Sequence, residues 1–326
     1  MNLKSNQNLK IEVRRYLRDD YQSWNRFIKY AKNATFLFNR KFMDYHKDRF
    51  DDYSLMVYKA DVLIALWPAN ISGSNLHSHQ GLTYGGLILN STTSLIDIEL
   101  IFDSILLFLR EKEIDKLILK SFLNLYASQP NEELEYIINK RGAKIIHQNL
   151  VLAINFQSDY TIYKSKLKRY RKLKSGKFQI KEGSTEFEPF WNNLLEPRLA
   201  EKYNTKPVHT LSEMLRLQKA FSNHIHQFNI YEDDELLAGI TIFKTKMAVK
   251  SQYGMASAKG EKLGALDMLF VYLIKMFQTE GARYFSMGRI NDDGFELGYN
   301  TGMLKQKQEF GCEIHLQPVY ELELND

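Results

Sequence analysis

The chain has 326 residues and a mass of 38.3 kDa, a length that is typical of two domains of ordinary size. Hydrophobic residues make up 44% and charged residues 25%, with a formal net charge of +5, and these values exclude disorder, collagen and low-complexity repeats for most of the chain. The single cysteine, Cys312, excludes an internal disulfide framework and a cysteine-based zinc site. Because the polar N-terminus lacks an apolar signal segment, we expect a cytoplasmic protein.

The first half of the sequence predicts a domain of mixed helices and strands. Apolar residues at helical spacing, among them Ile98, Ile101, Ile105 and Leu109, predict a helix over 97–112. The other expected elements are, in chain order, a strand at 11–17, helices at 21–31 and 40–47, a hairpin of 54–58 and 62–66, a strand at 85–89, a strand at 117–122, a helix at 132–140 and a strand at 145–156.

The stretch from Val62 to Ile96 contains no Asp, Glu, Lys or Arg. Pro68 and several glycines interrupt it, and its apolar runs are far shorter than the roughly 20 residues that cross a bilayer, so we expect no membrane span. The stretch indicates either buried sheet that lines a cleft or ordinary sheet and loop.

The second half predicts the same order of elements again. The expected elements are helices at 187–203 and 211–221, a hairpin of 228–231 and 236–243, a strand at 248–253, a helix at 266–279, a strand at 283–287, a helix at 297–305 and a strand at 314–324. Tyr58 and Tyr231 end corresponding strands, and the offset between matching segments is about 170 residues. We therefore predict a duplicated α/β domain, with domains at 1–158 and 159–326; chance similarity of two α/β halves is the alternative.

Residues 160–181 carry the basic character of the chain. They contain nine cations and no acid, whereas the rest of the chain has 35 basic and 39 acidic residues. Such a run can neutralise phosphates on nucleic acid, on an anionic membrane or on a diphosphate ligand, or it can simply be a solvated helix between the two halves. The absence of another basic patch argues against DNA as a partner.

Short motifs in the second half resemble the FemAB-like branch of the GNAT acyltransferase superfamily. They are 206–209, 236–240, 251–253, 264–267, 285–288, Asn291, 300–302, Lys305 and 310–311, and the segment 81–86 resembles the matching part of the first half. The resemblance extends over about residues 35–324. It implies two GNAT-like domains in tandem, each a mixed, mostly antiparallel sheet flanked by helices. It also implies transfer of an acyl or aminoacyl group to an amine, in or beside the C-terminal domain.

The resemblance further implies acetyl-CoA or another acyl-CoA as co-substrate, with its pyrophosphate at a helix N-terminus, where backbone N–H groups attract anions. We expect this site in a loop at 260–264. The candidate binding residues are Lys259, Gly260, Lys262, Gly264 and Ala265. The chain departs from the family pattern because Glu261 stands where the family has Arg or Gln, and its carboxylate repels phosphate. Aminoacyl-tRNA is therefore the alternative donor.

Four residues are candidates for the chemistry. His209 is the leading general base, because the unperturbed pKa of histidine lies near working pH. Gln252 and Tyr253 are expected where the third strand meets the cleft, to orient substrate or protonate a leaving thiolate. Asp267 is a second polar group near a helix start. Each has a structural alternative: a satisfied histidine, strand packing, or a match to the helix dipole.

Two further sets of polar residues are candidates for substrate binding. Asn291, Asn300 and Lys305 can bind hydroxyls or phosphate of the acceptor, and His77, His79 and Tyr84 can line an opposing wall. His77 and His79 have no third ligand nearby in sequence, so no metal site is predicted. The sequence also lacks a phosphate-binding loop of the P-loop type and a nucleophile elbow.

Three functions follow from these features. The first is an acyl-coenzyme A dependent N-acyltransferase that acts on an amino sugar or a similar cell-envelope precursor, free or lipid-linked. The second is an aminoacyl-tRNA dependent transferase that builds a peptidoglycan bridge and uses the basic run to bind tRNA. The third is a non-catalytic module that binds a polysaccharide or a partner. The chain has no segment with the heptad pattern of a long helical arm, which favours the first over the second.

Overall fold

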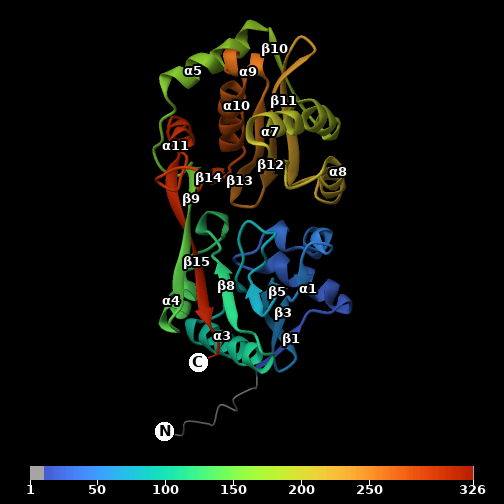
Figure 1. Ribbon diagram of the computed structural model, residues 1–326, viewed down its shortest axis with the longest axis vertical. Helices are drawn as coiled ribbons and strands as arrows, with labels where there is room; N and C mark the ends of the chain where they lie inside the picture. The colour runs from blue at the N-terminus through green and yellow to red at the C-terminus, as the bar shows by residue number, and fades with distance from the viewer. Residues whose placement is uncertain (1–10, 326) are drawn as a thin grey trace. The chain divides into compact units, whose positions relative to one another are not determined.

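In the computed structural model, which describes residues 11–325, the chain forms two units (Figure 1). Unit 1 runs to Gln148 and adds the chain from Gln317 onward, whereas unit 2 is Asn149–Leu316. The division differs from the predicted boundary at residue 158, because the chain leaves unit 1 within strand β9 (Lys144–Asn155) and returns to it within strand β15 (Glu313–Glu323).

Unit 1 combines short strands with four α-helices. The strands are β1 (Ile11–Arg15), β2 (Asp51–Asp52), β3 (Leu55–Lys59), β4 (Val62–Trp67), β5 (Asn70–Ser72), β6 (Asn75–His77), β7 (Ile88–Leu89) and β8 (Lys116–Lys120). The helices are α1 (Tyr21–Tyr30), α2 (Arg40–Met43), α3 (Leu95–Glu111) and α4 (Glu133–Lys140).

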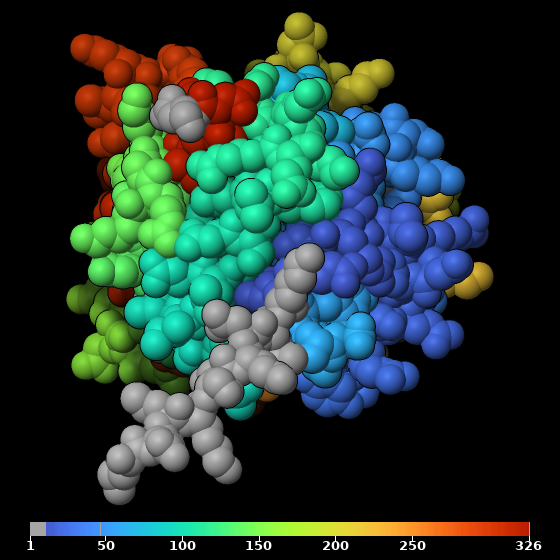
Figure 2. Space-filling view, turned by 90° about the horizontal axis from the view of Figure 1, so that it is seen from below, coloured from blue at the N-terminus to red at the C-terminus, as the bar shows by residue number. Residues whose placement is uncertain are grey.

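One side of unit 1 consists of the antiparallel pairs β1–β3, β3–β4 and β4–β7. On the other side, β6 runs parallel to β8. The last residues of the chain complete it, since Val319–Glu323 of β15 pair antiparallel with β8. Helix α3 buries the face that the spacing predicts, with all six of its inward apolar residues in the core. Figure 2 shows α3 at the surface of unit 1. Ile96 and Leu107, on the face of α3 that is turned away from the core, are exposed.

Unit 2 combines a twisted sheet with helices on both faces. Its strands are β10 (Phe178–Glu182), β11 (Ile225–Glu232), β12 (Glu235–Lys244), β13 (Ala248–Ala256) and β14 (Tyr284–Arg289), in the order β10-β11-β12-β13-β14-β9. Its helices are α5 (Lys164–Arg171), α6 (Phe187–Phe190), α7 (Glu196–Tyr203), α8 (Leu211–Ala220), α9 (Ala258–Leu263), α10 (Ala265–Thr279) and α11 (Thr301–Gln308), with the short helix η5 (Lys172–Ser175) after α5. The apolar face of α10 packs on β11–β14 and forms the centre of the core.

The two units repeat one arrangement. In unit 1 the parallel pair β6–β8 has three residue pairs, and in unit 2 the parallel pair β13–β14 also has three, from Ala248↔Tyr284 to Lys250↔Ser286. Each pair is preceded by an antiparallel hairpin with a register shift, β3–β4 in unit 1 and β11–β12 in unit 2. This correspondence agrees with the predicted order of elements in the two halves.

Several predicted elements differ from the structure. The helix expected at 297–305 lies instead at Thr301–Gln308, and the helix expected at 40–47 is α-helical only over Arg40–Met43. The predicted helix 187–203 is divided by a π-helical turn, Trp191–Leu195. The predicted strand 85–89 is reduced to the two residues of β7. The loop expected at 260–264 is wrong, because Ser257 accepts a hydrogen bond from the N–H of Gly260 and starts α9, which ends at Gly264.

No helix in the described range 11–325 has the length and the apolar character needed to cross a membrane. Within the same range, no three His, Cys, Asp or Glu residues gather as metal ligands would.

Candidate active site

A cleft of about 350 Å³ opens in unit 2 where β13 and β14 separate. The two strands pair only as far as Lys250 and Ser286, and beyond that point neither is bonded to the other. Gln252 is the extra residue of a β-bulge, because Ser251 pairs with Ile242 and Tyr253 pairs with Thr241. The cleft is lined by Lys250, Ser251, Gln252, Gly254, Leu266, Phe270, Met287, Gly288, Arg289, Met303, Gln306 and Lys307.

Lys307 places a buried ammonium group in this cleft. Its side chain extends from α11, and its Nζ donates to the carbonyl oxygens of Gly288 and Arg289 at 3.1 Å each. Only 5% of the residue is exposed, and burial lowers the pKa of Lys307 from 10.5 to about 8. A lysine with this pKa exchanges its proton near neutral pH, as a group that acts in catalysis must.

Gln252 contributes a second polar group to the cleft. Its side-chain oxygen Oε1 is buried and accepts no hydrogen bond from the described residues. A buried polar atom without a partner costs free energy, which a bound ligand that donates a hydrogen bond would recover. The lining therefore offers a cation at Lys307 and an acceptor at Gln252, together with the apolar surface of Leu266, Phe270 and Met287.

A second cavity of about 610 Å³ adjoins the first at the start of α10. The two cavities share the lining residues Gly254, Leu266, Met303 and Gln306. Cations and acids both line the second cavity, namely Lys166, Arg169, Lys202, Glu261, Asp267 and Asp292.

The predicted pyrophosphate site at this helix start is occupied by ion pairs. Glu261 bonds Arg198 at 2.9 Å and also pairs with Lys202, and these contacts hold the pKa of its carboxyl low. Lys259 pairs with Glu232 and Glu235 at 2.8 and 2.7 Å. A phosphate at the start of α10 would meet the Glu261 and Asp267 carboxylates, so these residues do not fit a diphosphate well.

Gly260, Gly264 and Ala265 allow neighbouring segments to pack closely against this part of the chain. A Cβ added to Gly260 would stand 2.0 Å from the backbone oxygen of Leu237, and one on Gly264 would stand 2.5 Å from Cδ of Arg169. Gly264 also has a φ of +73°, which favours glycine. Ala265 is buried at the first position of α10, and Lys262 is exposed.

Asp267 lies in a buried ion-pair network. Its carboxylate accepts hydrogen bonds from Lys166 Nζ at 3.0 and 3.1 Å and also pairs with Arg169. Lys166 in turn approaches Glu309 at 3.2 Å, so the network joins α5, α10 and the end of α11. These contacts are consistent with a structural role for Asp267, and equally with its predicted role as a second polar group of the site near the start of a helix.

His209 and Tyr253 contact each other next to Gln252. His209 Nδ1 lies 2.5 Å from the Tyr253 hydroxyl, and Trp191 donates its indole N–H to the His209 carbonyl at 3.2 Å. Burial raises the pKa of Tyr253 to about 12. Neither residue lines the two cavities, whereas their neighbour Gln252 does. Gln252, Tyr253 and His209 are therefore neighbours, since the Gln252 side chain also bonds Tyr253, whereas Asp267 lies apart in its ion-pair network.

The residues of unit 2 that were predicted to bind the acceptor do not lie together in one site. Asn300 lines the larger cavity and caps α11 by accepting from the N–H of Met303 at 2.9 Å. Asn291 accepts from the backbone N–H of Leu150 at 2.6 Å. Lys305 is exposed and lines neither cavity.

Lys307 was not among the residues predicted from the sequence, although the spacing of residues in α11 indicates that its side chain faces inward. On a helix, residues three and four apart share a face, so Met303, Gln306, Lys307 and Phe310 lie on one side. Phe310 is fully buried, which marks that side as the inward one. Lys305, two positions away, lies on the opposite side, so helical spacing alone separates the two lysines.

In unit 1 the three predicted wall residues do not form an open cleft. Tyr84 is 1% exposed, shares a hydrogen bond of 2.8 Å with Thr35 and packs on Phe122. His79 is 3% exposed and adopts a φ of +69°. His77 is half-buried at the end of β6, and burial lowers its pKa.

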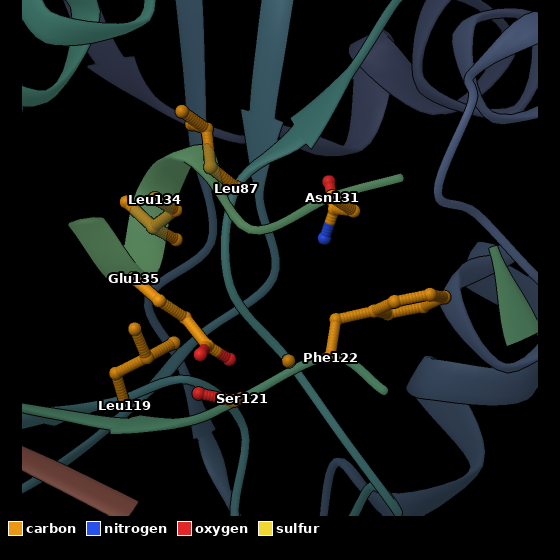
Figure 3. Close-up of a pocket in the computed structure, with 8 residues that line it drawn as sticks. Leu87, Leu119, Ser121, Phe122, Asn131, Leu134 and Glu135 are labelled. Atoms are coloured by element: carbon orange, nitrogen blue, oxygen red, sulfur yellow. The ribbon is translucent and has the colours of Figure 1, made fainter. Parts of the chain in front are cut away.

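The gap between the parallel strands of unit 1 is closed by the segment that follows β6. Ser78 and Gly85 donate their N–H groups to the carbonyls of Ile118 and Lys120, each at 2.9 Å. Only a water-sized cavity of about 10 Å³ remains, and Figure 3 shows the Glu135 carboxyl and the Ser121 hydroxyl pointing toward each other in it. Burial raises the pKa of Glu135. An acyl chain has no room there, in contrast to unit 2.

No protein-family model and no curated protein matches the chain. Solved structures do match. FemX aligns with a TM-score of 0.67 at 9% identity, over 96% of this chain and 98% of its own. A tandem GNAT protein from the clavulanic acid biosynthesis pathway aligns with a TM-score of 0.55 at 10% identity, over 97% and 99%. L-PGS from Bacillus licheniformis aligns with a TM-score of 0.55 at 14% identity, over 85% of each chain.

These alignments confirm the predicted fold. FemX and the tandem GNAT protein are covered almost completely, so the likeness extends over both units of this chain. The protein therefore has the tandem GNAT-like α/β architecture that the motifs in its second half imply. Because the sequence identities are 14% or less, the structural similarity is evidence for the fold alone.

Proposed function

We propose that unit 2 is an N-acyltransferase that moves an activated acyl group onto the amine of a sugar or another cell-envelope precursor. One observation carries the proposal: the separated strands β13 and β14 enclose a cleft that holds the bulged Gln252 and the buried ammonium of Lys307. The names of the structural neighbours, which include a tandem GNAT protein and L-PGS, support the same class of reaction.

The chemistry follows from the charges in the cleft. When the amine nitrogen attacks the acyl carbonyl carbon, the C–N bond forms, the carbonyl oxygen becomes negative, and the bond to the leaving group then breaks. The proton that the amine loses leaves with that group. In its charged form, Lys307 donates a hydrogen bond to the oxyanion, and Oε1 of Gln252 accepts one from the attacking amine. The apolar residues of the lining keep water away from the carbonyl.

The first donor that we propose is a coenzyme A thioester, whose leaving group is a thiolate. Its acyl arm fits a cleft of about 350 Å³, while its diphosphate does not fit the ion-paired start of α10. That misfit favours the second candidate, an aminoacyl-tRNA donor whose leaving group is a ribose oxygen. The third candidate, a non-catalytic module for a polysaccharide or partner, predicts no transfer with either donor.

Donor and reaction are tested separately. Calorimetry with coenzyme A and with desulfo-coenzyme A measures donor binding, and transfer from acetyl-CoA to a panel of amino sugars measures the reaction. A micromolar dissociation constant and acetylated amine support the first candidate. The absence of both, together with transfer from an aminoacyl-tRNA, supports the second.

The variant Lys307→Gln tests the site itself. Loss of one oxyanion donor lowers kcat by about a hundredfold to a thousandfold. Lys219→Gln is the matched control, because Lys219 is exposed on α8 and forms no ion pair among residues 11–325. Equal turnover of the two variants would place the reaction elsewhere.

A further inference from the structure

The nine cations of the basic run 160–181 divide into two groups in the structure. Three are engaged: Lys166 and Arg169 pair with Asp267, and Lys181 lies 4.7 Å over the ring of Tyr231. The other six are exposed and have no ion pair within the part of the chain that the structure describes. These six, which we call the α5 face, are Lys164, Lys168, Arg171, Lys172, Lys174 and Lys177.

The α5 face is one-sided. Lys164, Lys168 and Lys172 follow at intervals of four residues and therefore lie on one side of the helical turns. The apolar residues Leu167 and Leu173 are partly buried and pack against the core of unit 2. The outward side thus has cations and no apolar residue to insert into a partner, so its attraction is electrostatic.

The helix that carries the face is held firmly. Besides the Lys166 network, the N–H of Tyr163 donates to the carbonyl of Glu309 at 2.9 Å, and Gly264 lets Arg169 approach α10 closely. A platform that is already ordered loses little conformational freedom when it binds. Six like charges in one place also repel each other, which a bound polyanion would relieve.

We propose that the α5 face docks unit 2 onto an anionic bilayer, through the phosphates of its headgroups. The rest of the chain carries more acids than bases, 39 against 35, so a long polyanion that extends past the face would be repelled. Tyr163, which is 55% exposed beside Lys164, is a residue type enriched at the headgroup level of membranes.

Docking of the α5 face on a bilayer would bring lipid-linked acceptors close to the cleft. The cavity of about 610 Å³ is lined by Lys166 and Arg169 of the same helix, and it shares four lining residues with the cleft that holds Lys307. A lipid-linked acceptor in the bilayer would therefore reach the cleft from the docked side. The docking itself does not require unit 2 to be an acyltransferase, because it depends only on the charges of the α5 face.

The test is co-sedimentation of the full chain with vesicles of phosphatidylcholine, with and without phosphatidylglycerol. We expect binding only to the anionic vesicles, and loss of binding at high ionic strength. Replacing Lys164, Lys168 and Lys172 by Gln should weaken binding on the order of a hundredfold, from a roughly fivefold effect of each cation near an anionic surface.

The control is a triple variant with the same loss of charge, Arg216→Gln, Lys219→Gln and Lys246→Gln, at exposed positions of unit 2. It should bind like the wild type, and thermal melting confirms that both variants fold. Equal binding of the two variants, or no binding to anionic vesicles, would overturn the proposal. Tighter binding of a short single-stranded RNA than of the vesicles, lost in the α5-face variant, would also overturn it.

Discussion

Replacement of Lys307 by methionine should change how the stability of the protein depends on pH. Lys307 is 5% exposed, and burial lowers its pKa from 10.5 to about 8. Between these two values the unfolded chain keeps the proton that the folded chain has released. Stability therefore rises with pH through this window, and below about pH 8 the folded chain bears the full cost of a buried ammonium.

The size of the effect follows from the gap between the two pKa values. That gap corresponds to about 3 kcal/mol of unfolding free energy, gained by the wild type between about pH 8 and pH 10.5. The methionine variant also leaves the carbonyls of Gly288 and Arg289 without their donor, but that loss does not depend on pH. The difference between the two proteins should therefore shift by about 3 kcal/mol in favour of the wild type as pH rises.

Guanidinium unfolding of both proteins at a series of pH values between 7 and about 10.5 measures this difference. Because the other titrating groups are common to both chains, they cancel in the comparison. Lys219→Met serves as the control, because it makes the same substitution at an exposed position of unit 2. A difference between wild type and Lys307→Met that stays constant with pH would refute the reasoning about the burial of Lys307.

Further expected outcomes concern the cleft and its supports. If charged Lys307 stabilises the oxyanion, the pH–rate profile of transfer should fall above about pH 8 in the wild type, and a flat profile would argue against this role. Gln252→Ala should lower kcat about tenfold or more, with melting temperature nearly unchanged; an unaltered rate would remove Gln252 from the site. Asp267→Asn should cost about 3 kcal/mol, measured by chemical unfolding, because it weakens the pairing of buried Lys166; a second change, Lys166→Met, should restore much of the loss. Gly260→Ala should cost about 1–3 kcal/mol, since its Cβ would stand 2.0 Å from a backbone oxygen; a stable variant would show that α9 shifts freely.

The sequence by itself determined much of the architecture. Local periodicity predicted α3 and its buried face, because the side chains that define a helix face are neighbours in sequence. The hairpin of β3 and β4 followed from two β-rich runs with a short turn, and the structure confirms it. The repeated order of elements and the short motifs together indicated the tandem GNAT-like fold, which the solved structures confirm.

The site was predicted less completely, because its members are brought together by long-range packing. Gln252 was identified from its place on the third strand, and the structure puts it in the cleft. Tyr253 is the next residue on β13, yet it contacts His209 and lines neither cavity, and this contact between residues 44 positions apart could not be read from the sequence. A single sequence position thus separates a lining residue from a packed one.

Only the tertiary structure decided which charges are free to act. In the sequence, the cations of 160–181 form one uniform run. In the fold, Lys166 and Arg169 form ion pairs with Asp267, whereas six other cations of the run are exposed. Likewise, Lys305 and Lys307 differ only in which side of α11 they occupy, yet Lys305 is exposed, whereas Lys307 is buried and its pKa is lowered to about 8. Charge and pKa depend on neighbours distant in sequence and on access to water, and both are set when the chain packs.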